Sequence, residues 1–304
     1  MKLAFVGLGQ MGRHMAANLA DGQDDLIAVD RNLDRFPALQ ARGARTSTAV
    51  GDVVGAEVIF LCLPSAEAVA GVLLGQGGIA DRLEPGQVVV DTSTIAYGAT
   101  VEIARALEVR GVRFVDAPVS GMEARARDAT LTVMCGGAEP TFRLVEPFLA
   151  RMGNNVLFMG PVGSGQLTKL INQLLFDINA AALAEILPMA VKMGLDPEKV
   201  GAVVNSGTGR SYASEFFIPR VLEGNFAEGY AMRNAYKDLV GAAELGGRAC
   251  IPMPVLAAAT ATYQLALLQG HGDKDKGGMI RVFEDALGVA FRKQGASVAA
   301  TAGS

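Results

Sequence analysis

The sequence predicts an α/β domain with a doubly wound, mostly parallel sheet, followed by an all-helical second domain. Short apolar runs alternate with helical patterns over residues 1–163, as in parallel sheets whose strands are joined by helices. A glycine-rich turn directly follows the first of these runs. Strand patterns then cease, and helical patterns continue to the end of the chain. We therefore predict domains at residues 1–163 and 164–304.

Seven short apolar runs, most of them bounded by turn residues, are expected to form the sheet. In chain order they are Leu3–Val6, Leu26–Val29, Val58–Leu63, Val88–Asp91, Arg113–Asp116, Leu131–Cys135 and Val156–Met159. Apolar residues at helical spacing predict helices between most of them, over Met11–Ala20, Ala66–Leu74, Thr100–Arg110 and Pro140–Arg151.

The second domain is predicted to begin with a long helix after the turn Gly163-x-Gly165. Pro188 is expected to kink or end this helix. Asp196-Pro197 should start the next one, because a capping acid before a proline is typical of helix N-termini. Further helices are expected over Tyr236–Gly246, Pro254–Gln269 and Met279–Leu287, and a frayed tail is expected from Gly295.

Composition argues against several classes of partner. The net charge is −4, so the chain lacks the excess of basic residues typical of nucleic-acid-binding surfaces. Hydrophobic residues make up 50% of the sequence, yet no uncharged apolar run reaches the roughly 20 residues of a membrane span. We expect neither nucleic acid nor a membrane as partner. The surplus of apolar residues instead suggests burial at a domain or subunit interface.

The cysteines and the N-terminus predict a reducing cytoplasm as the location. Met1 leads directly into the first strand, so no signal peptide is expected. Cys62, Cys135 and Cys250 show no CxxC spacing, and none lies in an electropositive segment that would activate a thiol. No cluster of histidine, cysteine and aspartate has the spacing of metal ligands, so no metal is expected.

The turn Gly7-Leu8-Gly9-Gln10-Met11-Gly12 joins the first strand to the first helix. Its glycines permit a tight turn, close approach of the backbone to a pyrophosphate, and close packing of helix on strand. The phosphates would meet free N–H groups at the positive end of the helix. The strand Leu26–Val29 ends at Asp30, about where the acid that binds an adenosine ribose is expected. Together these features predict a Rossmann-type dinucleotide-binding domain.

Asp30 and Arg31 influence the choice of dinucleotide. The Asp30 carboxylate would accept hydrogen bonds from the ribose hydroxyls and repel a 2′-phosphate, which favours NAD. Arg31 could pair with a 2′-phosphate if its side chain swings inward, although a solvated loop arginine is the simpler interpretation. NAD is therefore expected, with NADP possible.

Lys169 and Asn172 are the candidate catalytic residues. They lie three residues apart near the start of the predicted long helix, so they share one helix face. A lysine in this apolar segment is partly desolvated, which lowers its pKa and suits it to proton transfer. The two histidines, His14 and His271, lie beside the phosphate turn and in a polar loop, and neither is expected to act as the base. A surface lysine on an ordinary amphipathic helix is the alternative interpretation.

Other polar groups follow the predicted strands. Ser120-Gly121, after the strand Arg113–Asp116, offers a hydroxyl and open backbone N–H groups to a carboxylate, although an ordinary loop is the alternative. Thr94 follows Val88–Asp91 and could contact the nicotinamide or its ribose. Leu63-Pro64 could line the cofactor groove or simply end a strand. Lys237-Asp238-Leu239 is expected to begin a helix, with a salt-bridged surface pair as the alternative.

Four motifs, taken in this order, resemble the β-hydroxyacid dehydrogenase family, which includes 3-hydroxyisobutyrate dehydrogenase and tartronate semialdehyde reductase. They are the turn at residues 7–12, Asp116–Gly121, Gly163-x-Gly165-x-x-x-Lys169-x-x-Asn172, and Lys237-Asp238-Leu239. The resemblance implies a Rossmann-type domain, a long connecting helix, an all-helical second domain, and homodimers or homotetramers. It also implies that Lys169 is catalytic with Asn172 as its partner, and that Ser120 and Gly121 contact a substrate carboxylate. The implied cofactor contacts are Leu63, Pro64, Thr94 and Lys237.

The chain departs from this family at two positions, because Met122 and Ala129 stand where the family usually has glycine. The methionine side chain takes up space beside the carboxylate turn and adds apolar surface. Met122 is therefore a further predicted substrate contact, and we expect a substrate different in shape from those of the smallest family members.

The expected reaction is hydride transfer between NAD(P) and a small 3-hydroxy acid of the 3-hydroxyisobutyrate type, with Lys169 as general acid and base. Tartronate semialdehyde reductase is an alternative, because Val29–Asn32 resembles some of these enzymes. An imine reductase usually has aspartate or tyrosine in place of the lysine. A non-catalytic dinucleotide-binding scaffold would be expected to lose it. Retention of Lys169 argues against both.

Overall fold

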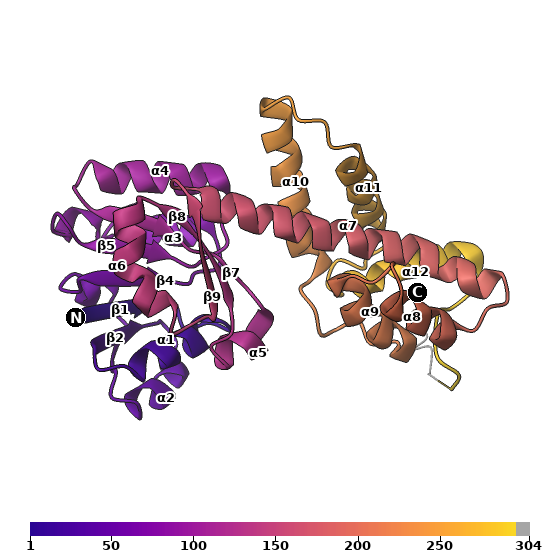
Figure 1. Ribbon diagram of the computed structural model, residues 1–304, viewed down its shortest axis with the longest axis horizontal. Coiled ribbons are helices and arrows are strands. Elements are labelled where there is room, and N and C mark those ends of the chain that lie inside the picture. Colours follow the sequence, from indigo (N-terminus) through magenta and orange to yellow (C-terminus); the bar gives the residue numbers. More distant parts are fainter. Residues whose placement is uncertain (296–304) are drawn as a thin grey trace. The chain divides into compact units, whose positions relative to one another are not determined.

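The computed structural model describes residues 1–295. The chain divides into two compact units, Met1–Lys169 and Leu170–Ser304, the first α/β and the second helical (Figure 1). This division falls inside a helix, whereas the domains predicted from the sequence meet at 163/164. The predicted frayed tail lies almost wholly outside the described residues.

Within the described chain, the first unit holds one nine-stranded sheet with the order β3-β2-β1-β4-β5-β6-β8-β7, and β9 also pairs with β8. All pairs from β3 across to β6 are parallel, whereas β8 is antiparallel to β6 and β7 and parallel to β9. The predicted mostly parallel sheet is therefore confirmed. The strands are β1 (Lys2–Val6), β2 (Asp25–Val29), β3 (Arg45–Ser47), β4 (Val58–Leu61), β5 (Val88–Asp91), β6 (Arg113–Asp116), β7 (Val119–Ser120), β8 (Thr132–Gly137) and β9 (Asn155–Gly160).

Helices cover both faces of the sheet. Successive side chains of a strand point to opposite faces, so each strand contributes apolar side chains to two separate clusters. Leu3 and Phe5 of β1 pack into one apolar cluster, whereas Ala4 and Val6 pack into another. The first cluster includes residues of α1 (Gly12–Ala20), α2 (Pro37–Gln40) and α6 (Glu139–Leu149). The second includes α3 (Ala66–Leu74) and α4 (Tyr97–Glu108). Short 3-10 turns occur at η1 (Leu33–Arg35), η2 (Val50–Val53) and η3 (Ala80–Arg82).

The sequence pattern missed two strands of this sheet. The β3 sequence, Arg-Thr-Ser, carries no apolar signal, and the strand is held by backbone pairing with β2 at the sheet edge. The two-residue strand β7 lies within the segment predicted as the Ser120-Gly121 loop, and it pairs with β8.

The second unit is built from helices around one apolar core. They are α7 (Ser164–Lys192), which begins in the first unit, then α8 (Pro197–Ser206), α9 (Tyr212–Glu223), α10 (Met232–Arg248), α11 (Pro254–Leu268), η4 (Lys276–Met279) and α12 (Ile280–Leu287). α10 and α11 lie side by side (Figure 1). Asp196 caps α8 as predicted, because its carboxylate accepts the N–H groups of Glu198 at 2.9 Å and Lys199 at 3.3 Å.

One local prediction in this unit was wrong, and one was tested only in part. Pro188 does not end α7, which continues to Lys192, whereas a kink at Pro188 stays a prediction. Because proline has no N–H, one carbonyl of the preceding turn lacks its helical hydrogen bond. Lys237-Asp238-Leu239 does not begin a helix, because α10 starts one turn earlier at Met232.

By length and composition alone α7 would be able to cross a membrane. Core helices of soluble proteins have the same properties. Here Ala180, Ala184 and Leu187 of α7 are buried in the core of the helical unit, which accounts for part of its apolar character.

A buried ion pair lies within the helical unit. Lys276 of η4 bonds to the carboxylate of Asp177 on α7, and the two side chains are 1% and 0% exposed. The lysine amine also lies 4.4 Å from the centre of the Phe176 ring. Burial raises the pKa of Asp177 to about 6, with the charge of Lys276 opposing this rise.

Met122 and Ala129 adopt left-handed backbone conformations, with φ of 61° and 54°. These are the positions at which the resemblance leads one to expect glycine. A side chain in this region costs roughly 1–2 kcal/mol per residue. The chain therefore carries side chains at two positions whose backbone conformation favours glycine.

Candidate active site

The glycine-rich turn is packed against its own sheet. Gly7 has a φ of 97°, and a Cβ on it would overlap the carbonyl group of Cys62. A Cβ on Gly12 would overlap the carbonyl oxygen of Gly7. Gly9 is exposed, and a Cβ there would meet no atom within 4 Å. The outer two glycines are thus required by internal packing, whereas the space beside Gly9 is open for the approach of a dinucleotide pyrophosphate.

Asp30 is fixed beside this turn. Its carboxylate accepts the backbone N–H of Leu8 at 2.6 Å and that of Asn32 at 2.8 Å. A carboxylate offers about four lone-pair positions, so it can accept further hydrogen bonds from ribose hydroxyls. Arg31 is exposed. The residues of this edge therefore fit a dinucleotide, and Asp30 fits one without a 2′-phosphate.

Replacing Asp30 by alanine is expected to weaken NADH binding far more than NADPH binding. The variant loses the hydrogen bond by which Asp30 holds the Leu8 amide in place, which affects the binding of both cofactors. Only NADH also loses an acceptor for its free ribose 2′-hydroxyl. Fluorescence titration of each reduced cofactor measures the two dissociation constants. Asp34→Ala in η1 is the matched control and should change neither. Equal losses for both cofactors in Asp30→Ala would show that Asp30 does not read the ribose.

The loops after β4 and β5 are joined to each other and to α7. The Leu63 N–H donates to the Ser93 hydroxyl at 2.8 Å. The Gln166 amide of α7 donates to the carbonyl of Ser93 at 2.7 Å and accepts the N–H of Ile95 at 3.2 Å. Leu63 is half-buried in this network, whereas the neighbouring predicted contacts, Pro64 and Thr94, are exposed.

Asp116, at the end of β6, holds the start of α7. Its two carboxylate oxygens accept the N–H of Gly163 at 2.7 Å and that of Gln166 at 2.9 Å. These are amides of the helix N-terminus that the helix itself leaves unbonded. Burial raises the pKa of Asp116, and the amide hydrogen bonds oppose that rise.

The glycines at this point make the close approach possible. A Cβ on Gly165 would overlap the carbonyl oxygen of Met134 and lie 2.8 Å from Asp116, whereas one on Gly163 would lie 2.5 Å from the Tyr97 ring. Gly163 also has a φ of 91°. The turn Gly163-x-Gly165 thus fixes the first turn of α7 at the carboxyl end of β6 and against β8.

Asp91 is a second buried carboxyl beside Asp116, because the two are register partners in β5 and β6. One of its oxygens accepts the Ser93 N–H at 3.0 Å, and the other has no hydrogen-bond partner among the described residues. Burial raises the pKa of Asp91 to about 7. Near neutral pH this group is therefore partly protonated, and the sequence analysis gave it no role.

Lys169 lies on the second turn of α7, at the end of the first unit, and its side chain is 9% exposed. Asn172 follows it by three residues, belongs to the helical unit and is exposed. Lys237 is exposed on α10 of the helical unit. Their assigned roles remain predictions.

The predicted carboxylate turn connects β7 to α5 (Met122–Arg127). Ser120 pairs with Thr132 of β8, and Gly121 has a φ of 141°. A Cβ on Gly121 would lie 2.9 Å from the Cβ and Cδ atoms of Arg125 and 3.1 Å from Leu131. The turn therefore needs glycine both for its backbone angle and for the packing of Arg125. Met122, which follows, is 44% exposed.

Glu123, just after the turn Ser120-Gly121, links that turn to the glycine-rich turn at residues 7–12. Its carboxylate accepts the side-chain amide of Gln10 at 2.8 Å, contacts the His14 ring nitrogen at 2.9 Å, and pairs with Arg13. The His14 hydrogen bond, followed by those from Gln10 and Arg13, lowers the pKa of Glu123 to about 2. The sequence analysis had no signal for this link, because the partners lie more than a hundred residues apart.

Other kinds of site find little support in the first unit. Burial raises the pKa of Cys62 to about 11 and that of Cys135 to about 12, so both stay protonated thiols at neutral pH. Among residues 1–295, no three histidine, cysteine or acidic side chains are grouped to hold a metal ion.

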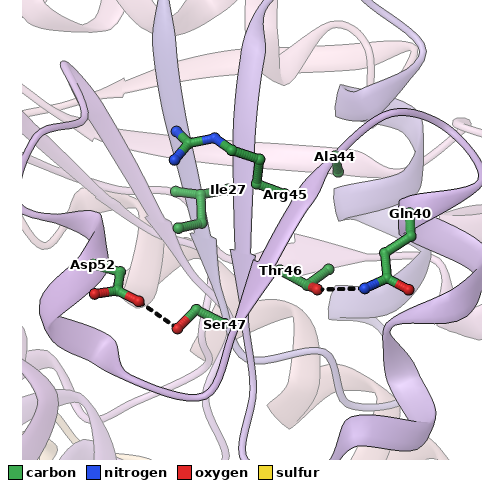
Figure 2. A pocket seen from close by; sticks show the side chains of 7 residues that line it. All are labelled: Ile27, Gln40, Ala44, Arg45, Thr46, Ser47 and Asp52. Atoms are coloured by element: carbon green, nitrogen blue, oxygen red, sulfur yellow. Dashed lines mark hydrogen bonds between the residues drawn. The ribbon is translucent and has the colours of Figure 1, made fainter.

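An open pocket lies at the sheet edge beside β3 and contains none of the predicted site residues. Figure 2 shows its lining, in which Ser47 donates to Asp52 at 2.5 Å and Gln40 donates to Thr46 at 2.8 Å. These side chains are thus bonded in two separate pairs, each of which joins the outer strand β3 to a neighbouring segment. The remaining lining residues are Ile27, Ala44 and Arg45.

Comparison with known proteins finds matches to both units. Residues 2–160 match the family described as the NAD binding domain of 6-phosphogluconate dehydrogenase. Residues 163–283 match the family described as the NAD-binding of NADP-dependent 3-hydroxyisobutyrate dehydrogenase.

Individual relatives match nearly the whole chain. The 2-(hydroxymethyl)glutarate dehydrogenase of Eubacterium barkeri is 36% identical over 95% of this chain and 97% of its own length. The mitochondrial 3-hydroxyisobutyrate dehydrogenase of Rattus norvegicus is 33% identical over 90% of this chain and 84% of its own. The solved structure of a 3-hydroxyisobutyrate dehydrogenase from Salmonella typhimurium has a TM-score of 0.83 at 28% identity, covering 93% of this chain and 100% of that one.

Proposed function

Because the chain belongs to the β-hydroxyacid dehydrogenase family of NAD(P)-dependent enzymes, we propose that it oxidises a small 2-substituted 3-hydroxy acid and prefers NAD. The observation that carries this proposal is the placement of Lys169. It is nearly buried on the second turn of α7, the helix whose start Asp116 holds at the carboxyl edge of the sheet. Ligands of open α/β sheets bind at that edge.

Each site residue has a role in this proposal. The glycine-rich turn and Asp30 would hold the dinucleotide, which would supply the acceptor for the hydride of the carbinol carbon. The Lys169 amine takes the hydroxyl proton during oxidation and returns it during reduction, a form of help worth roughly 10²–10⁴-fold in rate. The Asn172 amide orients the substrate hydroxyl for this proton transfer. The Ser120 hydroxyl and the Gly121 N–H bind the substrate carboxylate.

The substrate class is inferred from the relatives. The substrates after which they are named, 3-hydroxyisobutyrate and 2-(hydroxymethyl)glutarate, both carry a hydroxymethyl group on the carbon next to a carboxylate. They differ in the second substituent of that carbon, which is a methyl group in one and a carboxyethyl arm in the other. The shared part is what Lys169 and Ser120-Gly121 would bind.

A homodimer or homotetramer is part of the proposal. Along α7, the apolar side chains of Ile171, Leu175, Ile186 and Met189 are each more than half exposed. A helix face of this kind is typical of subunit interfaces. Light scattering that gave the mass of a single chain would contradict this part.

The proposal also places the enzyme in the cytoplasm, without nucleic acid or membrane as partner. Three cysteines that form no disulfide suit a reducing compartment. Recovery of the protein in the membrane fraction of disrupted cells would contradict this assignment.

The direct test is a substrate screen that follows absorbance of the reduced cofactor. We expect oxidation of 3-hydroxyisobutyrate or 2-(hydroxymethyl)glutarate with NAD, and slower oxidation with NADP. Tartronate semialdehyde, assayed in the reducing direction, is the comparison substrate. Turnover of the semialdehyde alone, or of none of the three, would contradict the proposed substrate class.

A further inference from the structure

Arg125 differs from the other charged residues of α5 in its bonding. Glu123 is committed to Gln10, Arg13 and His14, and Arg127 pairs with Asp128 at 3.3 Å. Among residues 1–295, the Arg125 side chain makes no hydrogen bond or ion pair. Its guanidinium group is therefore available to a ligand.

The side chain of Arg125 packs against the turn Ser120-Gly121. The side-chain stem lies over the Gly121 backbone, since a Cβ built on Gly121 would lie 2.9 Å from both Cβ and Cδ of Arg125. Met122 precedes Arg125 by one helical turn, so the two share a face of α5. The left-handed Met122 backbone starts this helix directly at the turn. The Arg125 cation and the exposed Met122 side chain thus adjoin Ser120 and Gly121, the residues proposed to bind the substrate carboxylate.

We propose that Arg125 binds a second carboxylate of the substrate and so selects 3-hydroxy acids with an acidic side arm. This rests on the proposed function, because it takes the first carboxylate to lie at Ser120-Gly121. In 2-(hydroxymethyl)glutarate, the second carboxylate lies at the end of a two-carbon arm on the carbon next to the first. A guanidinium group binds such a carboxylate through paired, charge-assisted hydrogen bonds. Met122 would contact the carbons of the arm.

The test compares two substrates in three proteins. Wild type, Arg125→Gln and Arg127→Gln are assayed with NAD on 2-(hydroxymethyl)glutarate and on 3-hydroxyisobutyrate, which lacks the second carboxylate. We expect Arg125→Gln to raise the KM for the dicarboxylate roughly ten- to hundredfold and to leave that for the monocarboxylate within about twofold. Arg127→Gln, two residues along the same helix, should leave the ratio of the two KM values unchanged.

Two further measurements separate binding from structure and from turnover. Added salt should raise the wild-type KM for the dicarboxylate but not that of Arg125→Gln, because an exposed ion pair is screened. Calorimetry of 2-(hydroxymethyl)glutarate binding to the NADH-loaded protein should show the same loss in Arg125→Gln without any turnover.

The possible failures can be told apart. Equal losses for both substrates, or an unchanged ratio in Arg125→Gln, would overturn the role of Arg125 and leave the proposed function standing. A wild-type preference for 3-hydroxyisobutyrate over the dicarboxylate would also overturn the role of Arg125 and leave the proposed function standing. Absence of turnover with either acid would instead contradict the proposed function, and the calorimetric comparison would still decide whether Arg125 binds the dicarboxylate.

Discussion

Lys169→Met is expected to lower kcat by at least about a hundredfold while leaving the fold and NADH binding intact. Methionine keeps the apolar stem of this 9% exposed side chain, so packing at the start of α7 should be preserved. What is lost is the amine that would take the hydroxyl proton and, as a cation, stabilise the developing alkoxide. Steady-state kinetics with the best acid from the screen gives kcat, and fluorescence titration gives NADH affinity.

Lys199→Met is the control for the loss of one positive charge. Lys199 is exposed at the start of α8, and its distance to Asp196 is 3.9 Å, so its replacement should change kcat little. If Lys169→Met kept activity within about tenfold of wild type, Lys169 would not be the proton carrier, given the size of such effects. A loss of NADH binding in the same variant would indicate a structural role.

Lys276→Met is expected to lower the free energy of unfolding by roughly 3–5 kcal/mol. The substitution leaves Asp177 as a charge at 0% exposure without its partner. Denaturant unfolding followed by circular dichroism measures the loss. Lys293→Met is the control, because Lys293 pairs with Glu223 at the surface, where such pairs contribute about 0–1 kcal/mol.

The effect of Lys276→Met should depend on pH. Burial already raises the pKa of Asp177 above its usual value, and loss of the lysine removes the charge that opposes this rise. A carboxyl whose pKa is higher in the folded than in the unfolded state binds protons more tightly when folded, so stability falls as pH rises through the folded pKa. The deficit of the variant should therefore be smaller at pH 5 than at pH 8.

The double variant Lys276→Met with Asp177→Leu should recover most of the lost stability, because it removes the unpaired charge. A deficit that did not change with pH, or a double variant no more stable than the single one, would assign the effect to lost packing.

The parallel part of the sheet was predictable because its central strands are buried on both faces and therefore almost wholly apolar, with Asp91 at the end of β5 as an exception. β4 and β5 are examples, since every residue in them is buried. β3 was not predictable, because it lies at the edge and gains its place through backbone pairing, which leaves no mark on side-chain type. The helix does not end at Pro188, because a proline removes a single helical hydrogen bond and packing of the neighbouring residues in the helical core outweighs that cost.

The site was predictable where a residue type follows from local backbone need. Gly7, Gly12, Gly163 and Gly165 are each forced by overlap with neighbouring atoms, so their spacing could be read from the sequence. Asp116, Gln166 and Glu123 were missed as site residues, because their importance comes from partners far away in the chain. Asp116 offered one signal as a polar residue at a strand end, and Gln166 as a polar residue at the start of an apolar helix, whereas Glu123 offered none.

Because α7 begins in one unit, where Asp116 accepts the Gln166 N–H of its first turn, and continues into the other, the protein cannot be dissected between its units without cutting a helix. A fragment that stopped at Gly163 would deprive the Asp116 carboxylate of the Gln166 amide and the carbonyl of Ser93 of its side-chain donor. Such a truncation would leave buried polar groups without partners, a defect that favours misfolding and aggregation. An autonomous nucleotide-binding fragment would therefore have to retain the opening turns of α7.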